Sequence, residues 1–450
     1  MKITFLGGVG TVTGSKYLIE QNGRRILIDC GLFQGYKQLR LRNWAPLPVS
    51  PSSIDAVLLT HAHLDHSGYL PLLVKNGFRG SIYATDATKD LCSILLPDSG
   101  HLQEQDAFFA NRHHFSKHKP ALPLYTEQDA VNCLEKFRSV PFHKAFNLFG
   151  LDIQYLRAGH ILGAAMIEVK GESKIVFSGD VGRPNDISMK PPETLPDTDY
   201  LVVESTYGNR VHNGENAEDA LANAIIKTAK RGGTVLIPAF AVGRTQTLLL
   251  YLSRLMNAKR IPALPIFLDS PMAINASDIF CRHPDDHKLK AEETRKAFAV
   301  AHYVRTAEES KSLDRMVIPK VIISASGMAT GGRVLHHLKS YASDTRNLIL
   351  FNGFQSGGTR GAAMVAGSKA VKIHGDYIPV NAEVRNLDML SAHADANEII
   401  DWLKQIPRQP RMTFVTHGEP DAADALRHRL SEQLGWQCTV PEYREEVQLP

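Results

Sequence analysis

LLTHAHLDHSG, residues 58–68, is the most informative stretch of this chain, because an apolar run is followed at once by four side chains that can bind metal. The four are His61, His63, Asp65 and His66. Polar side chains at the end of a buried strand are unfavourable unless something compensates them, and imidazole and carboxylate are ligands for Zn²⁺, Mn²⁺ and Fe. The alternative, a solvated loop that happens to be rich in His, explains a single His better than a cluster. The segment therefore predicts a metal site at the exit of a strand.

Composition limits the class of protein. The chain has 450 residues, of which 43% are hydrophobic and 22% are charged, which is enough for two or three globular cores. No apolar stretch approaches the roughly 18–20 residues of a membrane span. The first residues lack the apolar core and cleavage site of a signal peptide. We expect a soluble, cytoplasmic protein that has no membrane partner.

Cysteine spacing and net charge narrow the chemistry further. The five cysteines are scattered and form no CxxC pair, which fits neither a disulfide framework nor a thiolate zinc site. A metal would therefore be bound through nitrogen and oxygen atoms. The formal net charge of +4 permits a polyanionic partner but does not by itself argue for one.

Two patterns of secondary structure follow one another along the chain. Up to about residue 205, short apolar runs and Gly-rich turns predict mostly strands, and residues 56–60 read as a strand buried on both faces. From about residue 216, strands alternate with helices, which is typical of a parallel, doubly wound sheet. After about residue 385 the pattern predicts strand, helix, strand and a final amphipathic helix.

Further candidate ligands stand at the ends of later apolar runs. His160 lies in RAGHILGAA, Asp180 closes IVFSGD and His417 closes TFVTH. Two metals need more ligands than one loop supplies, and Asp180 offers two oxygens, which suits a bridging position. Taken singly, each of the three is explained as well by a structural role. Together with residues 58–68 they form a consistent set.

The order THAHLDH, GHILG, FSGD resembles the metallo-β-lactamase superfamily, whose αββα sandwich holds one or two metals at its open edge. Asp29, which closes RRILID, matches the acidic residue that ends an early strand in that family and supports the metal loop. The resemblance implies two Zn²⁺ ions as cofactors, with Mn²⁺ or Fe as alternatives. One ion would be bound by His61, His63, His160 and Asp180, and the other by Asp65, His66, Asp180 and His417. A structural metal site is the alternative, but such sites are usually closed and often rich in thiolates.

The interval between Asp180 and His417 is long enough to hold a whole domain. The chain is similar here to the β-CASP branch of the superfamily, the RNA-processing nucleases typified by cleavage and polyadenylation endonucleases and by RNase J. Four segments carry this similarity: LPDSGHLQEQDA (96–107), PAFAVGRTQ (238–246), SGMATGGR (326–333) and GFQSGGTRG (353–361). The resemblance implies an α/β protein, a metallo-β-lactamase sandwich interrupted by an inserted parallel-sheet α/β (β-CASP) domain. We place the two parts of the sandwich at 1–207 and 386–450 and the insert at 208–385.

Two Gly-rich segments are candidate phosphate sites. SGMATGGR and GFQSGGTRG both open predicted helices, and backbone N–H groups at such turns bind anions. Their hydroxyls could donate to phosphate oxygens, and their two Arg residues offer charge-assisted contacts. The alternative is that the glycines only make tight turns. The candidate substrate-binding residues are Ser326, Gly331, Arg333, Ser356, Gly357, Thr359 and Arg360.

The resemblance also assigns catalytic roles. His393, in LSAHADANE, would lie near the scissile phosphate and protonate the leaving oxygen, oriented by Glu204 of VVESTYGNR. A His paired with a carboxylate keeps its proton near neutral pH, as a general acid requires. Asp65 would orient the attacking hydroxide and take its proton. The alternative is that His393 is a satisfied, non-catalytic histidine.

These features predict a two-metal hydrolase, a ribonuclease that cleaves phosphodiester bonds of single-stranded RNA as an endonuclease, with 5′ exonuclease activity in addition. One rival is a small-molecule thioester or lactone hydrolase with the insert as a lid, but the landmarks are Gly, Ser and Arg rather than apolar residues. The other rival is a non-catalytic RNA-binding subunit, but every expected ligand is present. The sequence leaves the native metal, the RNA target and the oligomeric state open, a homodimer being one alternative.

Overall fold

The structure, a computed structural model, describes residues 1–114, 116–212 and 214–450. It divides into two units, the first formed by Met1–Val211 with His393–Pro450, and the second by His212–Ala392. The second unit is thus inserted into the sequence of the first. Among the described residues, no helix is both long enough and apolar enough to cross a bilayer.

The first unit is built on two sheets, each of seven strands among the described residues. The first sheet has the order β22-β1-β2-β3-β4-β5-β6, and the second has the order β21-β20-β11-β10-β9-β8-β7. The strands of the first sheet are β1 (Lys2–Gly7), β2 (Lys16–Gln21), β3 (Arg24–Ile28), β4 (Ala56–Leu58), β5 (Ser81–Ala84), β6 (Phe137–Ser139) and β22 (Glu446–Gln448). Those of the second are β7 (Phe146–Leu148), β8 (Leu151–Arg157), β9 (Ala165–Lys170), β10 (Lys174–Phe177), β11 (Tyr200–Glu204), β20 (Met412–Thr416) and β21 (Cys438–Thr439).

One apolar core joins the two sheets. Phe5 of β1 contacts Phe414 of β20 with ring centroids 5.1 Å apart, and Tyr17 of β2 contacts Phe177 of β10 at 5.8 Å. Alternate residues of the strands supply the rest of this buried cluster, as expected for sheets packed face to face. The sheets therefore form the two inner layers of a sandwich.

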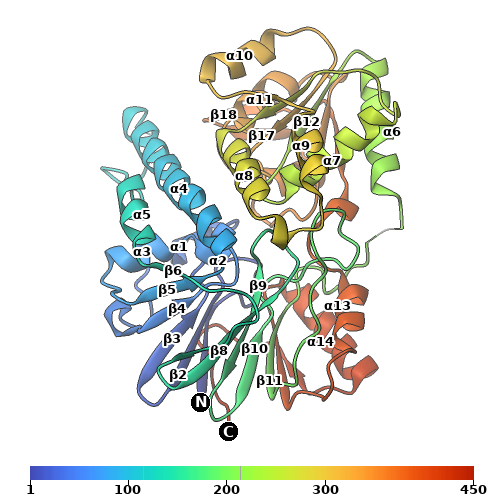
Figure 1. Ribbon diagram of the computed structural model, residues 1–450. Helices are drawn as coiled ribbons and strands as arrows, with labels where there is room; N and C mark the ends of the chain where they lie inside the picture. Colours follow the sequence, from blue (N-terminus) through green and yellow to red (C-terminus); the bar gives the residue numbers. More distant parts are fainter. Residues whose placement is uncertain (115, 213) are drawn as a thin grey trace. The chain divides into compact units, whose positions relative to one another are not determined.

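Helices cover the outer faces of this sandwich (Figure 1). Those near the first sheet are α1 (Lys37–Arg42), α2 (Leu64–Ser67), α3 (Leu70–Lys75), α4 (Asp86–Arg112) and α5 (Glu127–Leu134), with the short 3₁₀ turn η1 (Pro51–Ser53). Those beside the second are α13 (Ala396–Leu403) and α14 (Pro420–Leu434). The layers are therefore αββα, which confirms the predicted sandwich.

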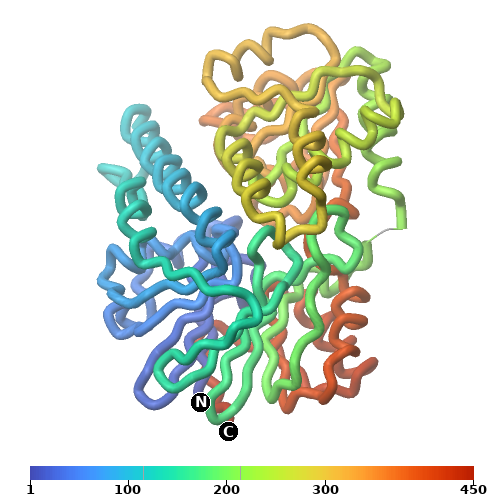
Figure 2. The backbone as a smooth tube through the Cα atoms, in the orientation of Figure 1, coloured from blue at the N-terminus to red at the C-terminus, as the bar shows by residue number. Residues whose placement is uncertain are grey.

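The last part of the chain completes both sheets. β22 pairs antiparallel with β1, and β20 pairs parallel with β11, so that Glu204 lies opposite Thr416. The two termini consequently lie close together (Figure 2), and the amino group of Met1 is 3.3 Å from the carbonyl oxygen of Leu449. This pairing brings residues after 393 back to the strands that precede the insertion.

Parallel pairing explains why functional side chains gather at one edge. β3, β4 and β5 are parallel neighbours, and so are β10, β11 and β20. Parallel strands have their carboxyl ends at the same edge of a sheet. The candidate residues of the site follow, or stand at, these carboxyl ends: Asp29 after β3, His61 after β4, Asp180 after β10, Glu204 at the end of β11 and His417 after β20.

The second unit is a parallel α/β sheet, as the alternating sequence pattern predicted. Among the described residues it has six strands, in the order β14-β13-β15-β12-β16-β19, and every neighbouring pair is parallel. These strands are β12 (Thr234–Pro238), β13 (Ile266–Asp269), β14 (His302–Tyr303), β15 (Lys320–Ser324), β16 (Leu348–Phe351) and β19 (Glu383–Asn386), and a separate hairpin joins β17 (Ala370–Ile373) to β18 (Asp376–Pro379). The central strands β12 and β15 are buried at every position, because helices cover both faces.

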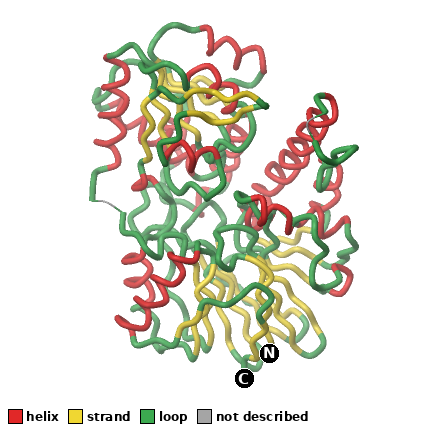
Figure 3. Tube along the Cα trace, turned by 180° about the vertical axis from the view of Figure 1, so that it is seen from behind, coloured by secondary structure: helices red, strands yellow, loops and turns green. Residues whose placement is uncertain are grey.

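The helices of the second unit lie around its strands, as the red and yellow segments of Figure 3 show, and along the chain they are interspersed with the strands. They are α6 (Ala217–Lys230), α7 (Arg244–Asn257), α8 (Pro271–Arg282), α9 (Ala291–Phe298), α10 (Ala307–Arg315), α11 (Val334–Tyr341) and α12 (Arg360–Val365), with the 3₁₀ turns η2 (Pro284–Asp286) and η3 (Asp388–Leu390). The observed helix α6 agrees closely with the helix predicted from residue 216.

A buried charge network ties α10 and α11 to the end of β13. His337 donates from Nε2 to Asp269 and from Nδ1 to Asp314, both at 2.7 Å. Burial opposes the charged form of His337, but the two carboxylates outweigh it and raise its pKa to about 8. Since this pKa lies above the usual imidazole value of 6.5, the folded state holds the proton of His337 more tightly than the unfolded state does.

We therefore expect the second unit to lose stability as the pH rises through this range. The contribution of His337, about 2 kcal/mol for a shift of this size, is complete below about pH 6.5 and is lost as the pH rises through about 8. Urea unfolding of the parent and of His337→Gln between pH 6 and pH 9 measures it. The difference between the two proteins should shrink with rising pH, whereas His428→Gln, which alters an exposed His–Asp pair, should show little difference at any pH. A constant difference for His337→Gln would contradict this assignment.

Candidate metal centre

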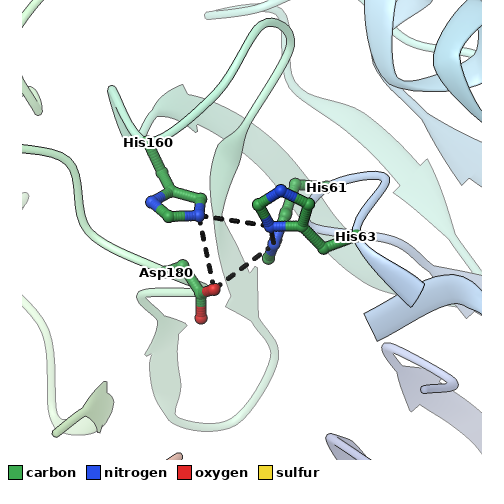
Figure 4. A group of neighbouring side chains, drawn as sticks. All are labelled: His61, His63, His160 and Asp180. Atoms are coloured by element: carbon green, nitrogen blue, oxygen red, sulfur yellow. Dashed lines mark hydrogen bonds and ion pairs between the residues drawn. The ribbon is translucent and has the colours of Figure 1, made fainter. Parts of the chain in front are cut away.

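Four side chains of the first unit converge on one position (Figure 4). His61, His63, His160 and Asp180 each offer a ligand atom, and these atoms lie within 4.8 Å of one another. Nδ1 of His63 is 3.2 Å from Nε2 of His61 and 3.3 Å from Nε2 of His160. Oδ2 of Asp180 lies 3.4 Å and 3.6 Å from the same two Nε2 atoms. Three imidazoles and a carboxylate in this arrangement fit the ligand set of a divalent cation.

A second group lies on the other side of Asp180. Asp65, His66 and His417 also offer ligand atoms within 4.8 Å of one another. Oδ1 of Asp180 is 3.1 Å from Nε2 of His66 and 3.4 Å from Nε2 of His417. Asp180 therefore directs one carboxylate oxygen to each group, which is the geometry of a bridging ligand.

The buried polar atoms of this cluster fit a bound cation. Oδ1 of Asp180 and Nε2 of His66 are buried, and although they lie 3.1 Å apart, among the described residues neither makes a hydrogen bond of normal geometry. Such atoms are costly unless an ion or another group satisfies them. All the donors are nitrogen or oxygen, which suits Zn²⁺, Mn²⁺ or Fe.

Electrostatics places several rings in the form that binds metal. Burial, reinforced by neighbouring histidines, lowers the pKa of His63 and of His160 well below the usual imidazole value, so both are neutral near pH 7. Burial also opposes ionisation of Asp180, but His417, His66 and His61 outweigh it and hold the pKa of this carboxyl well below its usual value. Neutral His63 and His160 and an ionised Asp180 are the forms required for metal binding. The pKa of His66 shifts the other way, because Asp180 and Asp29 outweigh its burial and raise the pKa well above the usual value.

Hydrogen bonds from behind the cluster orient its rings. Asp29 accepts from the backbone N–H and the hydroxyl of Thr60, both at 2.8 Å, and its Oδ2 lies 2.7 Å from Nδ1 of His66. Nδ1 of His417 is likewise 2.7 Å from the hydroxyl of Ser15. Holding Nδ1 in this way leaves Nε2 of each ring directed toward Asp180, which is the usual role of groups behind a metal ligand.

Replacing Asp29 by Ala should weaken metal binding without abolishing the fold. Loss of one such supporting carboxylate typically costs about 10–100-fold in metal affinity. Competition with a chromophoric chelator measures the change, and Asp55→Ala is a matched control because Asp55 pairs with Arg24 away from the cluster. Parent-like metal affinity in Asp29→Ala would show that Asp29 does not support the metal loop.

Glu204 and His393 form a pair beside the cluster. Nδ1 of His393 lies 3.1 Å and 3.2 Å from the two carboxylate oxygens of Glu204. Glu204 is itself fixed, since Oε1 accepts from the backbone N–H of Val181 at 2.6 Å. The His393 ring lies 4.4 Å from that of His160, and its side chain is 13% exposed, so it reaches solvent at the edge of the cluster. Because Nδ1 faces Glu204, Nε2 of His393 points away from that carboxylate.

The two Arg residues of the candidate phosphate loops are engaged within the second unit. Arg333 donates to Asp269 at 2.6 Å and to the carbonyl of Arg305 at 2.7 Å. Arg360 donates to the carbonyl of Lys372 at 2.6 Å and to that of Thr330 at 3.2 Å. These contacts hold neighbouring segments together, so they favour the structural alternative for both guanidinium groups.

The hydroxyls of these loops also have local partners. Thr359 caps α12 by accepting from the N–H of Ala362 at 3.1 Å, and it donates to the carbonyl of Ser356 at 2.7 Å. Ser326 shares a hydrogen bond of 2.9 Å with the hydroxyl of Thr330. Gly331 has open space where a side chain would stand. Phosphate binding by these loops, Gly357 included, stays a prediction.

Sequence reasoning missed Ser15. It lies in the Gly-rich segment before β2, and its partner His417 is far away along the chain. The segment GTVTGS gave a local signal of a tight turn, but nothing in it pointed to a metal ligand.

The αββα layers and the His/Asp cluster define the class of protein as a metal-binding hydrolase fold, and comparison with known families agrees. Three family models match: the metallo-beta-lactamase superfamily over residues 9–89, the Beta-Casp domain over 245–364, and the Zn-dependent metallo-hydrolase RNA specificity domain over 377–441. The chain belongs to the β-CASP branch of the metallo-β-lactamase superfamily, which confirms the resemblance read from its motifs.

Several curated proteins are similar over nearly the whole chain. Ribonuclease TTHA0252 of Thermus thermophilus is 37% identical, covering 99% of this chain and 100% of that protein. An RNase J-like protein of Methanocaldococcus jannaschii is 29% identical over 93% and 92%, and the transcription termination factor FttA of the same organism is 29% identical over 96% and 70%. A crystal structure of a protein of unknown function from Enterococcus faecalis shares the fold at 12% identity, with a TM-score of 0.53 and coverage of 100% and 99%.

Proposed function

We propose that this protein is a metal-dependent ribonuclease that hydrolyses phosphodiester bonds of single-stranded RNA at a two-metal centre. The observation that carries the proposal is Asp180, which directs Oδ2 to one group of ligands and Oδ1 to the other. The class of activity is supported by the relatives named ribonuclease and RNase J-like. They do not favour a thioester or lactone hydrolase, or a subunit without activity.

The ligand set would be divided between two ions. We assign His61, His63, His160 and Asp180 to one, and Asp65, His66, Asp180 and His417 to the other, with Zn²⁺ expected and Mn²⁺ or Fe as alternatives. Two divalent ions there, when bound, would activate a water for attack and screen the charge of the phosphate. The rest of the mechanism is supplied by side chains of the chain itself.

Proton movements are assigned to two side chains at the edge of the cluster. The Asp65 carboxylate, which is partly exposed and 3.8 Å from Nε2 of His417, would orient the attacking water and accept its proton. Nε2 of His393 would donate a proton to the departing 3′ oxygen of the RNA. Glu204 would orient that imidazole through its contacts with Nδ1. Hydrolysis in this sense leaves a 5′ phosphate and a 3′ hydroxyl.

The mode of cleavage is proposed to be endonucleolytic, with 5′ exonuclease activity in addition. The groups proposed to contact the phosphates of the RNA are the hydroxyl and backbone groups of Ser326, Gly331, Ser356 and Gly357. Thr359 would act through its helix cap. Arg333 and Arg360 would act by fixing these loops rather than by direct contact.

Incubation with single-stranded RNA, labelled either at the 5′ end or internally, tests the proposal. We expect internal cleavage that a chelator abolishes and that Zn²⁺ or Mn²⁺ restores, with 5′ phosphates on the products. Cleavage of thioesters or lactones but not of RNA, or RNA binding without any cleavage, would overturn it.

A further inference from the structure

Helix α4 exposes apolar side chains at its C-terminal end. Its first half is packed, with Leu91, Leu95 and Leu96 buried, but in residues 101–112, all of which are described, only Ala110 is buried. Phe108 is 56% exposed and Phe109 is 48% exposed. This end of α4 projects away from the two sheets of its own unit (Figures 1 and 3). The sheets of this unit therefore leave these two rings uncovered.

The exposed rings are arranged in an ordered group. The centroids of Phe108 and Phe109 are 5.9 Å apart, and the ring of His113 stacks on Phe109 at 6.3 Å with an interplanar angle of 20°. The chain that follows is tied back to the helix, because Asn111 exchanges hydrogen bonds of 3.0 Å and 2.7 Å with Ala121. We call the exposed Phe108, Phe109, Arg112 and His113, with the adjoining Lys117 and Lys119, the α4 tip.

The segment that follows the two rings carries charge of one sign. From residue 107 to residue 126 the sequence contains no Asp or Glu, whereas Arg112, Lys117 and Lys119 are cationic. All three are exposed, and none of them forms an ion pair within the part of the chain that the structure describes. Two acidic residues lie one turn earlier on the helix, Glu104 four residues before Phe108 and Asp106 three residues before Phe109.

Aromatic faces beside cations favour one kind of partner. Single-stranded nucleic acids bind where bases stack on exposed rings and phosphates meet Lys or Arg. A second copy of this chain packing through the same surface would bring like charges together, which is unfavourable. We propose that the α4 tip is an RNA-binding surface separate from the metal centre, an inference that rests on the proposed ribonuclease function.

Because α4 is long, the α4 tip lies far from the metal centre. The helix begins beside the metal loop, where Thr85 and Thr88 both donate to the carbonyl of Gly163, close to His160. At about 1.5 Å per residue, Phe108 lies roughly 30 Å further along the helix. A long RNA held at the metal centre can reach the tip, whereas a tetranucleotide cannot span both places. The tip should therefore favour long substrates over short ones.

Kinetics of the double variant Phe108→Ala/Phe109→Ala on the two substrates test the proposal. The ratio of kcat/KM for a long single-stranded RNA to that for a tetranucleotide should fall at least about tenfold, because stacking on the two rings together contributes at least that much to binding. Phe109→Trp, which keeps an aromatic face, should preserve the ratio. Phe149→Ala is the matched control, since it removes a 41% exposed ring elsewhere in the same unit.

Binding under chelation gives a readout that does not depend on cleavage. The anisotropy of a fluorescent long RNA should show weaker binding for the double variant. For Lys117→Gln/Lys119→Gln, the slope of log affinity against log salt should decrease by about 0.7 for each phosphate that a lysine no longer neutralises.

Unchanged affinity in both variants, or an unchanged kcat/KM ratio, would overturn the proposal. So would a dimeric parent that becomes monomeric when the two Phe are replaced, because the surface would then bind a second copy. If the parent cleaves neither RNA, the proposed function fails, and the anisotropy result still decides the fate of the α4 tip.

Discussion

Replacing Asp180 by Ala is expected to remove bound metal and to lower RNA turnover by at least about 10³-fold. Its two oxygens serve both groups of ligands, Oδ2 lying 3.4 Å from Nε2 of His61 and Oδ1 lying 3.1 Å from Nε2 of His66. Among the described residues of the cluster, no other single side chain is shared in this way, so loss of one residue should disturb both sites. Metal content by mass spectrometry and kcat/KM on RNA, measured on the same preparation, test this expectation.

Two companion variants separate this effect from a general loss of structure. Asp180→Asn keeps the shape of the side chain but not its charge, so it should bind metal more weakly than the parent while unfolding at a similar temperature. Asp197→Ala removes an exposed carboxylate that pairs with Arg408, and it should leave metal content and activity unchanged. Retention of both metals in Asp180→Ala would contradict the bridging assignment.

His393→Ala is expected to keep its metal yet lose about 10²–10⁴-fold in turnover, the range that a general acid contributes. His393 belongs to neither of the two groups of ligands assigned to the metals, and its Nδ1 lies 3.1 Å from a carboxylate oxygen of Glu204. In this variant turnover should therefore fall while metal content stays at the parent level, whereas both should fall in Asp180→Ala. Glu204→Gln should lower turnover less and should shift the basic limb of the pH–rate profile, since it weakens the interaction that favours the charged imidazole.

The leaving group provides the sharper control for His393. From a nitrophenyl phosphodiester the nitrophenolate leaves without being protonated. The loss of turnover caused by His393→Ala should therefore be much smaller on that substrate than on RNA. An equal loss on both substrates would mean that His393 positions the substrate instead of donating a proton. If His393→Ala turned over RNA at the parent's rate, His393 would have no catalytic role.

The strand pattern and the candidate ligands could be predicted from the sequence because their signals are local. The strands of the second unit are short apolar runs buried on both faces, as in TVLIP of β12, and they alternate regularly with helices. The candidate ligands follow apolar runs directly, as His61 follows β4 and His417 follows β20. Parallel pairing then brings the ends of those runs to one edge of the sandwich.

Other features depend on partners that are distant in the sequence. Arg333 lies in a Gly-rich turn that favours a phosphate site, but its guanidinium meets Asp269 of β13, and nothing near position 333 announces that contact. Ser15 gains its importance only because His417 returns to it through the pairing of β20 with β11. The length of α4 was equally hidden, because Pro97 lies inside the helix at a point where a helix would be expected to end.

Anomalous X-ray diffraction from crystals of the metal-loaded protein tests the central claim most directly. The account predicts two peaks, about 3.5–4 Å apart, one between His61, His63 and His160 and the other between Asp65, His66 and His417, with the Asp180 carboxylate touching both. A single peak, or a peak that leaves His160 or His417 outside bonding distance, would contradict it.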